Sequence, residues 1–546
     1  MSSADRIRVE LVAAARELGA DESVDPVIER PRDPSLGDWT TNLAMTLARP
    51  LRKRPAEIAG LLRDRMHLAD AAVEKVDIAG PGFMNFWLDP ASIAESVRDV
   101  IAANDKFGRT DVGHGERANV EFVSANPTGP LHVGHGRQAA LGDAISTLLE
   151  WTGWNVSREF YYNDAGAQIE NLAASVRAWI ESAQGGEMII PEGGYHGEYI
   201  REIAERYARE RGSVDGSDEG DVKDYAIAAL RAEQDLDLQA FGVKFDRYFL
   251  ESSLYSDGKV DETVQALNAA GMTYESDGAL WLRTSQFGDD KDRVMRKSDG
   301  TYTYFLPDVA YHVTKWQRGF HRAIDVQGAD HHSTTTRVRA GLQALNMGIA
   351  PDYPEYVLHQ MVTVMKSGEE VKISKRAGSY VTVRDLINEV GRDAVRFFFL
   401  MRKSDSQLVF DIDVALKQSE ENPVYYVQMA HARMCGIFRV GEIDRETFSA
   451  DGIDLGVLRE PEEQELIKAL ADFPQVVAAA AASLEPHRIA TYLTETARLA
   501  HLWYHRHHVL GEPELIMQAR LALARAAQIV IRNALGILGI NAPERM

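Results

Sequence analysis

The stretch ANPTGPLHVGHG, residues 125–136, decides the fold of this chain. It follows an apolar segment at 119–123 with the character of a buried strand. It precedes a segment at 139–151 with helical spacing, and Gly153 lies just beyond that segment as a helix-ending residue. A second strand-like run follows at 156–162. A strand, a Pro- and Gly-shaped turn, a helix and another strand in this order predict a parallel α/β sheet.

Two histidines in this stretch carry its chemistry. His132 and His135 lie three residues apart, so both rings can project from the same side of a first helical turn. That turn also offers free backbone N–H groups and the positive end of the helix dipole. Gly134 and Gly136 are expected to let a ligand approach the backbone closely. A bare pair at this spacing usually sits on a helix by chance, but within this turn it predicts a phosphate site.

A second segment, VKISKRAG at 371–378, is rich in positive charge. Lys372 and Lys375 flank Ser374, and a glycine follows, which suits a loop that grips polyphosphate. Taken alone, a Lys- and Arg-rich segment of this kind is more often a solvated basic turn. The two segments in this order within one α/β region are far more specific than either one.

Together they resemble the signatures of class I aminoacyl-tRNA synthetases. His132-Val133-Gly134-His135 matches the "HIGH" motif, and residues 372–376 match the "KMSKS" loop, with Ile for Met and Arg for the final Ser. Further segments narrow the resemblance to the bacterial-type arginyl-tRNA synthetase family: YYNDAG at 161–166, SDGTYTY at 298–304, and NPVYYVQ at 422–428 followed by AHAR. The resemblance covers essentially the whole chain.

The pattern and the resemblance together predict an α/β protein of three domains. A Rossmann-like parallel-sheet catalytic domain is expected at 113–400. An N-terminal α+β domain at 1–112 would contact tRNA, and a C-terminal all-α bundle at 401–546 would bind the anticodon. The acidic, Gly- and Ser-rich stretch 209–224 is expected to be an exposed, mobile loop.

The resemblance implies that arginine reacts with ATP to give arginyl-adenylate and that the arginyl group then passes to the 3′ end of tRNA(Arg). Mg²⁺ would accompany ATP as a substrate partner; no tightly bound cofactor and no resident metal are implied. The catalytic residues by this resemblance are His132, His135, Lys372 and Lys375. The ATP-binding residues are Thr128, Gly134, His135, Gly136, Gly328, Asp330, Ser374 and Lys375. The arginine-binding residues are Ser124, Asn126, Tyr304 and Asp308.

Two of these assignments have structural alternatives. The run Gly328 to His331 can be a structural turn rather than an adenosine-binding element. Asp308 can be the N-cap of a helix that begins at Val309, since Asp is favoured at that position.

Composition sets the cellular context. The chain has 546 residues, a formal net charge of −22 and one cysteine, which excludes an internal disulfide framework and a multi-cysteine zinc site. We find no signal-like start and no apolar run near the eighteen or so residues of a membrane span. We expect a cytoplasmic, monomeric protein that does not bind membranes. An acidic surface disfavours non-specific binding to nucleic acid but allows local basic patches.

Three rival interpretations were weighed. A small ligase with the same ATP fold would seldom need a long helical C-terminal domain. The cysteine enzyme of the same class uses a cysteine-containing zinc site, which one cysteine makes unsuitable. A catalytically silent tRNA-binding relative is disfavoured by the intact His132, His135, Lys372 and Lys375.

Overall fold

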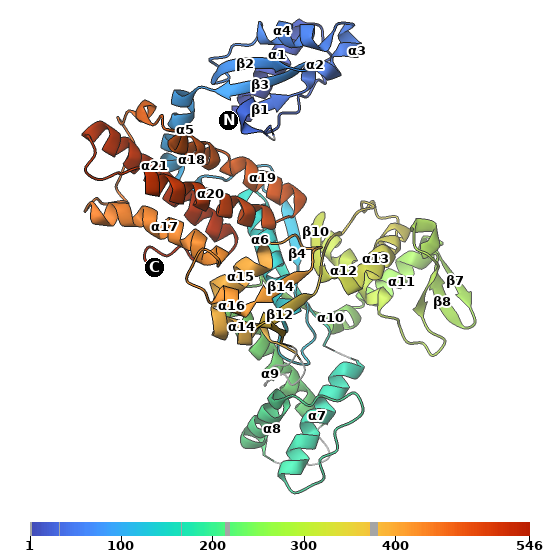
Figure 1. The fold of residues 1–546 in the computed structure, drawn as a ribbon. Helices are drawn as coiled ribbons and strands as arrows, with labels where there is room; N and C mark the ends of the chain where they lie inside the picture. Colours follow the sequence, from blue (N-terminus) through green and yellow to red (C-terminus); the bar gives the residue numbers. More distant parts are fainter. Residues whose placement is uncertain (1–2, 32, 165, 213–218, 372–379) are drawn as a thin grey trace.

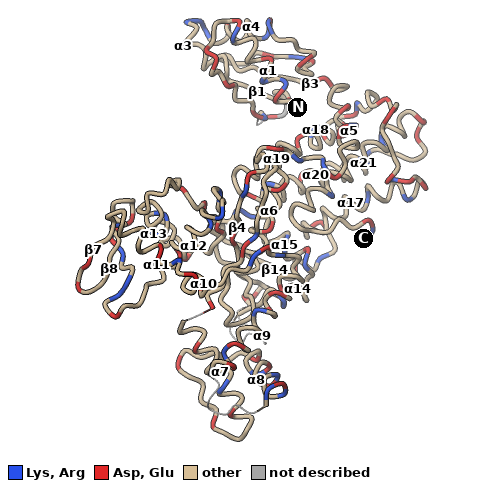
Figure 2. Tube along the Cα trace, turned by 180° about the vertical axis from the view of Figure 1, so that it is seen from behind, with Lys and Arg blue, Asp and Glu red and all other residues tan. Residues whose placement is uncertain are grey.

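The computed structural model describes residues 3–31, 33–164, 166–212, 219–371 and 380–546. A central sheet lies in the middle of the molecule, with the helical bundle beside it and the N-terminal domain beyond the bundle (Figure 1). Two lobes project from the sheet, one built on α7–α9 and one on α11–α13 with β7 and β8. Lys and Arg are interspersed with Asp and Glu along all of these parts (Figure 2).

The N-terminal domain is a three-stranded antiparallel sheet covered by helices. The strand order is β1-β3-β2, and the tight turn at 80–82 joins β2 to β3. The elements are α1 (Ser3–Glu17), β1 (Trp39–Thr41), α2 (Leu43–Thr46), α3 (Ala48–Leu51), α4 (Pro55–Arg63), β2 (Val73–Ala79) and β3 (Phe83–Leu88).

The central sheet has five parallel strands in the order β11-β10-β4-β5-β6. They are β4 (Arg117–Glu121), β5 (Asn155–Tyr162), β6 (Arg247–Leu250), β10 (Arg322–Gly328) and β11 (Glu355–His359). From β4 the chain proceeds to β5 and β6 on one side, whereas β10 and β11 lie on the other. Strand order therefore reverses between β4 and β10, and a crevice for ligands forms at the carboxyl ends of strands at such a point.

The helix after β4 confirms the expected strand–turn–helix unit but begins earlier. α6 runs Val133–Trp151 and buries most of its length between the sheet and the bundle. The two histidines described below cap its first turn. The helix therefore begins at Val133, six residues before the segment at 139–151 in which the apolar spacing predicts a helix. Gly153 follows its end with φ +88°, the left-handed conformation that favours glycine.

One lobe is inserted between β5 and β6, and the other between β6 and β10. The first contains α7 (Ala167–Ala183), α8 (Glu198–Arg211) and α9 (Glu219–Ala240), which share an apolar core. The second contains α10 (Glu251–Ser256), α11 (Lys259–Ala269), β7 (Thr273–Ser276), β8 (Ala279–Leu282), β9 (Arg293–Arg296) and α12 (Phe305–Gln317). α13 (His332–Ala344) follows β10 and packs on α12.

The expected loop at 209–224 is helical over most of its described length. Residues 209–211 end α8, and residues 219–224 begin α9. Composition misled the prediction because the charged residues lie on the outer faces of amphipathic helices, where charge does not oppose helix formation. Residues 213–218 lie outside the described residues.

A small sheet links the catalytic core to the bundle. β12 (Val362–Lys366) pairs in parallel with β14 (Leu408–Asp411) and antiparallel with β13 (Glu369–Glu370). α14 (Val383–Val390), α15 (Arg392–Leu400) and α16 (Ile412–Ala415) surround it. The division into 1–112, 113–400 and 401–546 stays a prediction.

The C-terminal bundle contains five helices in the order of the chain. They are α17 (Pro423–Val440), α18 (Pro461–Ala471), α19 (Phe473–Ser483), α20 (His487–Arg506) and α21 (Glu514–Ile537). α5 (Pro90–Ala103) packs against α18 and α21, so it joins the bundle rather than the N-terminal sheet. Arg98 of α5 donates to the carbonyl oxygen of Ile453 at 3.0 Å.

Among the described residues, one helical stretch, Pro461–Ser483, is long and apolar enough by length and composition to cross a membrane, with a mean hydropathy of 1.3. It consists of α18 and α19, which meet at Asp472. Asp472 pairs with Arg30 of the N-terminal domain at 2.5 Å. Core helices of a bundle pass the same test.

Arg396 ties the sheet, the first lobe and the bundle together. Its side chain is fully buried on α15 and pairs with Asp143 of α6 at 2.6 Å. It also donates to the carbonyl oxygens of Leu538 at 2.8 Å and Phe241 at 3.2 Å. A Cβ at Gly539 would lie 2.3 Å from the guanidinium, so a glycine is required there.

Replacing this guanidinium should destabilise the protein strongly. We expect Arg396→Met to lower the free energy of unfolding by about 3–5 kcal/mol, because Asp143 and two carbonyl oxygens lose a buried partner. The control is Arg498→Met, whose exposed pair with Glu495 contributes at most about 1 kcal/mol. Chemical denaturation measures both variants, and equal effects would contradict a structural role for Arg396.

Candidate active site

The two signature histidines cap the first turn of α6 reciprocally. His132 is the N-cap, and its Nδ1 accepts from the backbone N–H of His135 at 3.2 Å. The Nδ1 of His135 accepts from the backbone N–H of His132 at 3.4 Å, and the two rings stack with centroids 3.6 Å apart. Each Nδ1 is thus an acceptor, so the ring proton of each neutral histidine lies on Nε2.

Burial keeps both rings neutral. It lowers the pKa of His132 and holds the pKa of His135 well below its usual value, where the neighbouring His132 adds to the effect. The pair therefore presents Nε2–H donors rather than cations. Neutral donors held in one tautomer can hydrogen-bond phosphate oxygens without a change of protonation.

Packing within the protein explains why Gly134 and Gly136 of the motif are glycines. A Cβ at Gly134 would lie 2.8 Å from the His132 ring, and a Cβ at Gly136 would lie 2.7 Å from Val383 and 2.9 Å from Phe399. The space at both positions is therefore filled by the protein's own side chains. Room for a ligand, the reason expected from the sequence, is not what demands glycine here.

The chain that follows the second motif returns to the first one. The N–H of Val133 donates to Val381 O at 3.1 Å, and Val383 N donates to Leu131 O at 2.9 Å. The Tyr380 hydroxyl donates to Pro130 O at 2.9 Å, and its ring meets His132 edge-on. Lys372, Ser374 and Lys375 lie outside the described residues, but Tyr380, just after them, lies at the signature turn.

The first lobe grips the same turn from the other side. Gln234 of α9, which is fully buried, donates to the carbonyl oxygens of Asn126 at 3.1 Å and Gly129 at 2.9 Å. Tyr199 of α8 donates to Thr128 O at 2.9 Å, and the Asn126 amide donates to Gln168 Oε1 at 2.7 Å. Three helices of the lobe thus position a turn that is distant in sequence.

A cavity of about 570 Å³ opens between the turn and the lobe. Asn126, Thr128, His132 and His135 line it from the turn side, and the roles predicted for them stay predictions. Tyr195, His196 and Tyr199 line it from the lobe and were missed. The Gly-rich run at 193–197, which carries an aromatic residue and a histidine, is the signal that could have found them.

The nucleotide residues expected after β10 lie beside the histidines. Gly328 ends β10, and a Cβ there would lie 2.3 Å from Asp330 Oδ1, so a side chain at this position would displace the Asp330 carboxylate. The exposed Asp330 carboxylate opposes the lowering of the His132 pKa, which places the two near each other. His359 at the end of β11 is a further buried histidine in this group, and burial lowers its pKa to about 4.

The backbone after β4 is strained where Ser124 was predicted to bind. Val123 has φ +69° and Ser124 has φ +41°, and such values are unfavourable for residues other than glycine. Ser124 Oγ donates to Glu121 at 2.9 Å and accepts from the N–H of Tyr161 at 3.2 Å. These bonds hold the strained turn in place.

Asp308 lies in the first turns of α12, four residues after the helix N-cap. The helix begins at Phe305 with Tyr304 as its N-cap, so the alternative of a helix capped by Asp308 is wrong. Pro307 suggested a helix start after it, but proline is also tolerated within the first turn of a helix. The Tyr304 side chain is 75% exposed at the helix start.

The Asp308 carboxylate is partly buried and has no hydrogen-bond donor among the described residues. Burial raises its pKa to about 7, and His312 opposes this rise while Glu251 adds to it. Glu251, which follows β6, is buried and accepts from the Tyr161 hydroxyl at 2.8 Å. Glu251 is thus close enough to Asp308 to raise its pKa, and a cation between two such carboxylates would relieve their repulsion.

Sequence reasoning missed Glu251. Its position directly after a parallel strand, at the edge where the ligand crevice forms, is the signal that could have found it.

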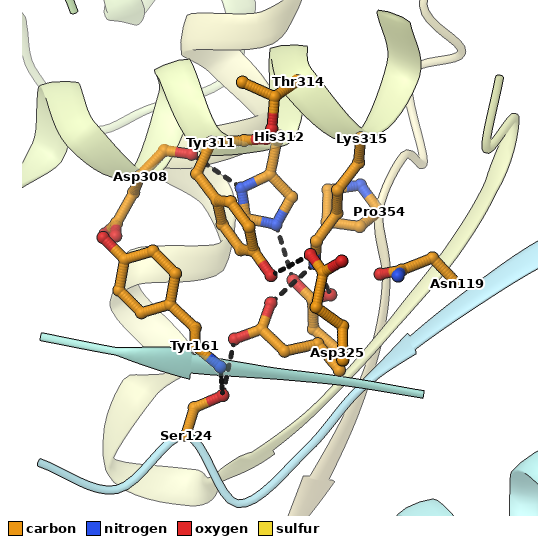
Figure 3. Close-up of polar contacts among 12 residues, drawn as sticks. Asn119, Ser124, Tyr161, Asp308, Tyr311, His312, Thr314, Lys315, Asp325 and Pro354 are labelled. Carbon is orange, nitrogen blue, oxygen red and sulfur yellow. Dashed lines mark hydrogen bonds and ion pairs between the residues drawn. The ribbon is translucent and has the colours of Figure 1, made fainter. Parts of the chain in front are cut away.

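Beneath Asp308 lies a buried ion network (Figure 3). Lys315 Nζ lies 2.6 Å from Glu121 and 2.8 Å from Asp325, and His312 Nε2 lies 2.6 Å from the other oxygen of Asp325. Glu121, His312 and Asp325 have the spacing of metal ligands. The Lys315 ammonium already fills the position of a cation between the two carboxylates.

Comparison with known proteins agrees with this geometry. Three family models match the chain: "Arginyl tRNA synthetase N terminal domain" at 5–88, "tRNA synthetases class I (R), catalytic domain" at 96–408, and "DALR anticodon binding domain" at 427–546. Arginine–tRNA ligases from Thiobacillus denitrificans and Geotalea daltonii are 54% and 55% identical. The matches cover 99% of both chains in the first case, and 97% of this chain and 96% of the relative in the second. The chain belongs to the arginyl-tRNA synthetase family.

The fold agrees as well. The structure of the Thermus thermophilus arginyl-tRNA synthetase matches with a TM-score of 0.76 over 99% of each chain, at 24% identity. The predicted fold class, an α/β catalytic core with an N-terminal α+β domain and a helical C-terminal bundle, is confirmed.

The Asp308 carboxylate should make this synthetase less stable as pH rises. A folded pKa near 7 against 3.8 unfolded means that the folded state holds a proton that the unfolded chain has released. The free energy of unfolding therefore decreases as pH rises from the unfolded pKa to the folded pKa of Asp308. Asp308→Asn removes the effect, so the variant should gain about 1–2 kcal/mol on wild type between about pH 5 and pH 8, a figure reduced for partial exposure.

Urea denaturation at both pH values measures this gain. The control is Asp299→Asn, because hydrogen bonds from Thr301 lower the pKa of that exposed carboxylate and no gain at high pH is expected. A difference between Asp308→Asn and wild type that does not change with pH would show that Asp308 is not desolvated.

Proposed function

We propose that this chain is an ATP-dependent arginine–tRNA ligase that acts in the cytoplasm as a monomer, without binding membranes. The arginine carboxylate attacks the α-phosphorus of ATP, and pyrophosphate leaves. A terminal ribose hydroxyl of tRNA(Arg) then attacks the arginyl carbonyl, and AMP leaves. The single observation that carries the proposal is a pair of neutral histidines at the start of the helix that follows β4, with the Asp308 carboxylate on α12, a helix tied to β4 and β10 where strand order reverses.

We assign ATP to the cavity beside the signature turn. Nε2–H groups of His132 and His135 would donate to phosphate oxygens, and Lys372 and Lys375 would add positive charge as pyrophosphate forms. Mg²⁺ would accompany the phosphates. The remaining residues assigned to ATP are Thr128, Gly134, Gly136, Gly328, Asp330 and Ser374.

We assign arginine to the pocket between α12 and the ends of β4 and β5. Asp308 would pair with the guanidinium, and Glu251 would add a second carboxylate. Asn126, held by Gln168, would meet the backbone end of the substrate. Ser124 and Tyr304 complete the assignment.

We assign the anticodon to the bundle, within 401–546. A groove of about 640 Å³ runs between α17 and the segment after α20, and Arg433, Arg439, Tyr504, His508 and Arg545 contribute to it. The Arg433 guanidinium lies 5.6 Å from the centre of the Tyr504 ring. Such cationic and aromatic groups suit unpaired bases. The N-terminal domain, within 1–112, would contact tRNA elsewhere.

Two other residues of these kinds in the bundle are structural. Trp503 is fully buried, and Arg525 is 2% exposed with its guanidinium on Gln528. Neither can stack on a base.

The substrate assignment is tested by discrimination between arginine and citrulline. Citrulline has nearly the same volume but no charge, so the difference must be read by a carboxylate that is left unpaired when the cation is absent, and such sites discriminate by about 10⁴–10⁵. Asp308→Asn should raise the arginine KM strongly and narrow the arginine-to-citrulline ratio of kcat/KM. Aminoacylation of total tRNA with all twenty amino acids and citrulline measures this, and charging by another amino acid would overturn the proposal.

The grip of the first lobe should control activity. Gln234→Leu removes both amide donors from the signature turn at nearly constant volume. We expect kcat/KM for arginine to fall by about tenfold to a hundredfold, because small displacements of positioned groups are costly. Gln239→Leu on the same helix is the control, since its exposed amide bonds only Asp235. Equal kcat/KM values for the two variants would exclude a positioning role for Gln234.

A further inference from the structure

His312 lies between two groups that can only accept hydrogen bonds. It sits on α12 one turn after Asp308 and is 4% exposed. Its Nδ1 lies 2.7 Å from the backbone carbonyl oxygen of Asp308, and its Nε2 lies 2.6 Å from Asp325 Oδ2 (Figure 3). The protonation of the ring follows from these two partners.

A carbonyl oxygen has no proton to give, so Nδ1 must carry one. The other oxygen of Asp325 accepts from the Lys315 ammonium at 2.8 Å. Burial by itself would raise the pKa of Asp325, but the Lys315 ammonium against it overcomes this effect and lowers that pKa, so Asp325 is a carboxylate. Nε2 must then carry a proton too, and the ring is an imidazolium.

The chain contains a second buried histidine with the opposite pattern. His431 Nδ1 donates to Pro543 O at 2.8 Å, while its Nε2 faces the Gln528 side-chain nitrogen at 2.8 Å. The oxygen of that amide accepts from Arg525, which orients the nitrogen as a donor. His431 therefore has one donor and one acceptor nitrogen and is neutral, and burial lowers its pKa to about 4.

The charges of the buried groups around His312 show why its positive charge matters for Asp308. Lys315 and His312 together balance Glu121 and Asp325, which leaves Asp308 and Glu251 without a cation among the described residues. The titratable groups that face this region are Glu121 on β4, Tyr161 on β5, Glu251 on α10, Asp308, Tyr311 and Lys315 on α12, Asp325 on β10 and Tyr356 on β11. Of these eight groups Lys315 is a cation and the other seven are acids. Glu159, which also faces Lys315 and Tyr311, is paired with Arg318.

We propose that His312 carries a positive charge at neutral pH and acts as a positioning residue that keeps Asp308 ionised for a guanidinium. The inference rests on the proposed function, because it gives the arginine pocket its charge. Its hydrogen bond to the Asp308 carbonyl also holds the turn that presents the carboxylate.

The direction of the effect follows from the charges. Burial raises the pKa of Asp308 to about 7, and His312 is the leading opposing influence. A neutral residue at 312 would raise the pKa of Asp308 further, and more of the free enzyme would hold a protonated, uncharged Asp308 at neutral pH. The acidic limb of kcat/KM for arginine reports this pKa.

The protonation itself can be observed in the unaltered protein. With ¹⁵N-histidine labelling at about pH 8, we expect one ring in which both nitrogens are protonated, as its two acceptor partners require. This signal should vanish in His312→Gln and persist in His431→Gln. A His312 ring with one unprotonated nitrogen at that pH would overturn the proposal, whatever the substrate is.

The consequence is measured by kinetics. His312→Gln should lower kcat/KM for arginine at least about tenfold at about pH 6.5, with recovery toward wild type at about pH 8.5, since one pKa unit corresponds to a tenfold change. His431→Gln, the matched control, should leave the acidic limb in place. His312→Lys, which restores a cation, should return the limb toward wild type.

The outcomes separate this proposal from the proposed function. A uniform loss at all pH values in His312→Gln, with no shift of the limb, would mean a purely structural histidine and would overturn the inference. Failure of the wild type to charge tRNA with arginine would overturn the function instead. The labelling result decides the charge of His312 even if His312→Gln does not fold.

Discussion

One buried ammonium group, that of Lys315, joins the elements on which the site depends. Its Nζ lies between Glu121 on β4 and Asp325 on β10, two neighbouring parallel strands. Two buried carboxylates on either side of one ammonium would repel each other if that ammonium were absent. Without a cation, each would also have a large desolvation cost. The ammonium removes that conflict, and the lysine stem fixes α12 against both strands.

This arrangement fixes α12, which carries Asp308, against the two strands between which strand order reverses. Glu121, which belongs to this network, is the last residue of β4 and accepts a hydrogen bond from Ser124. The strained turn at Val123 and Ser124 and then the signature turn follow it in the chain. Stability and site geometry are therefore linked through the same few charges. Asp308 is the exception, because it is desolvated without a fixed partner, as expected of a group that waits for a cation.

The histidine pair in the region assigned to the nucleotide also combines a structural role with a binding role. His132 and His135 satisfy the free N–H groups at the start of α6 with their own rings. The same bonds select the tautomer, so the donors that remain face outward. Gln234 and Tyr199 then hold the turn from a lobe that shares no sheet with it. Movement of the lobe would reach the histidines through these carbonyl contacts.

Local sequence determined the class of fold, the strand–turn–helix unit around residues 125–151, the histidine pair and the family, because turn chemistry and periodicity are properties of neighbouring residues. Only the tertiary structure decided which distant groups meet. Glu251, Gln234 and His312 carry no local signature, since their roles come from partners far along the chain, on other strands and helices. Charge states are decided in the same way, because desolvation and opposite charges depend on what the fold packs around a residue and not on its neighbours in sequence.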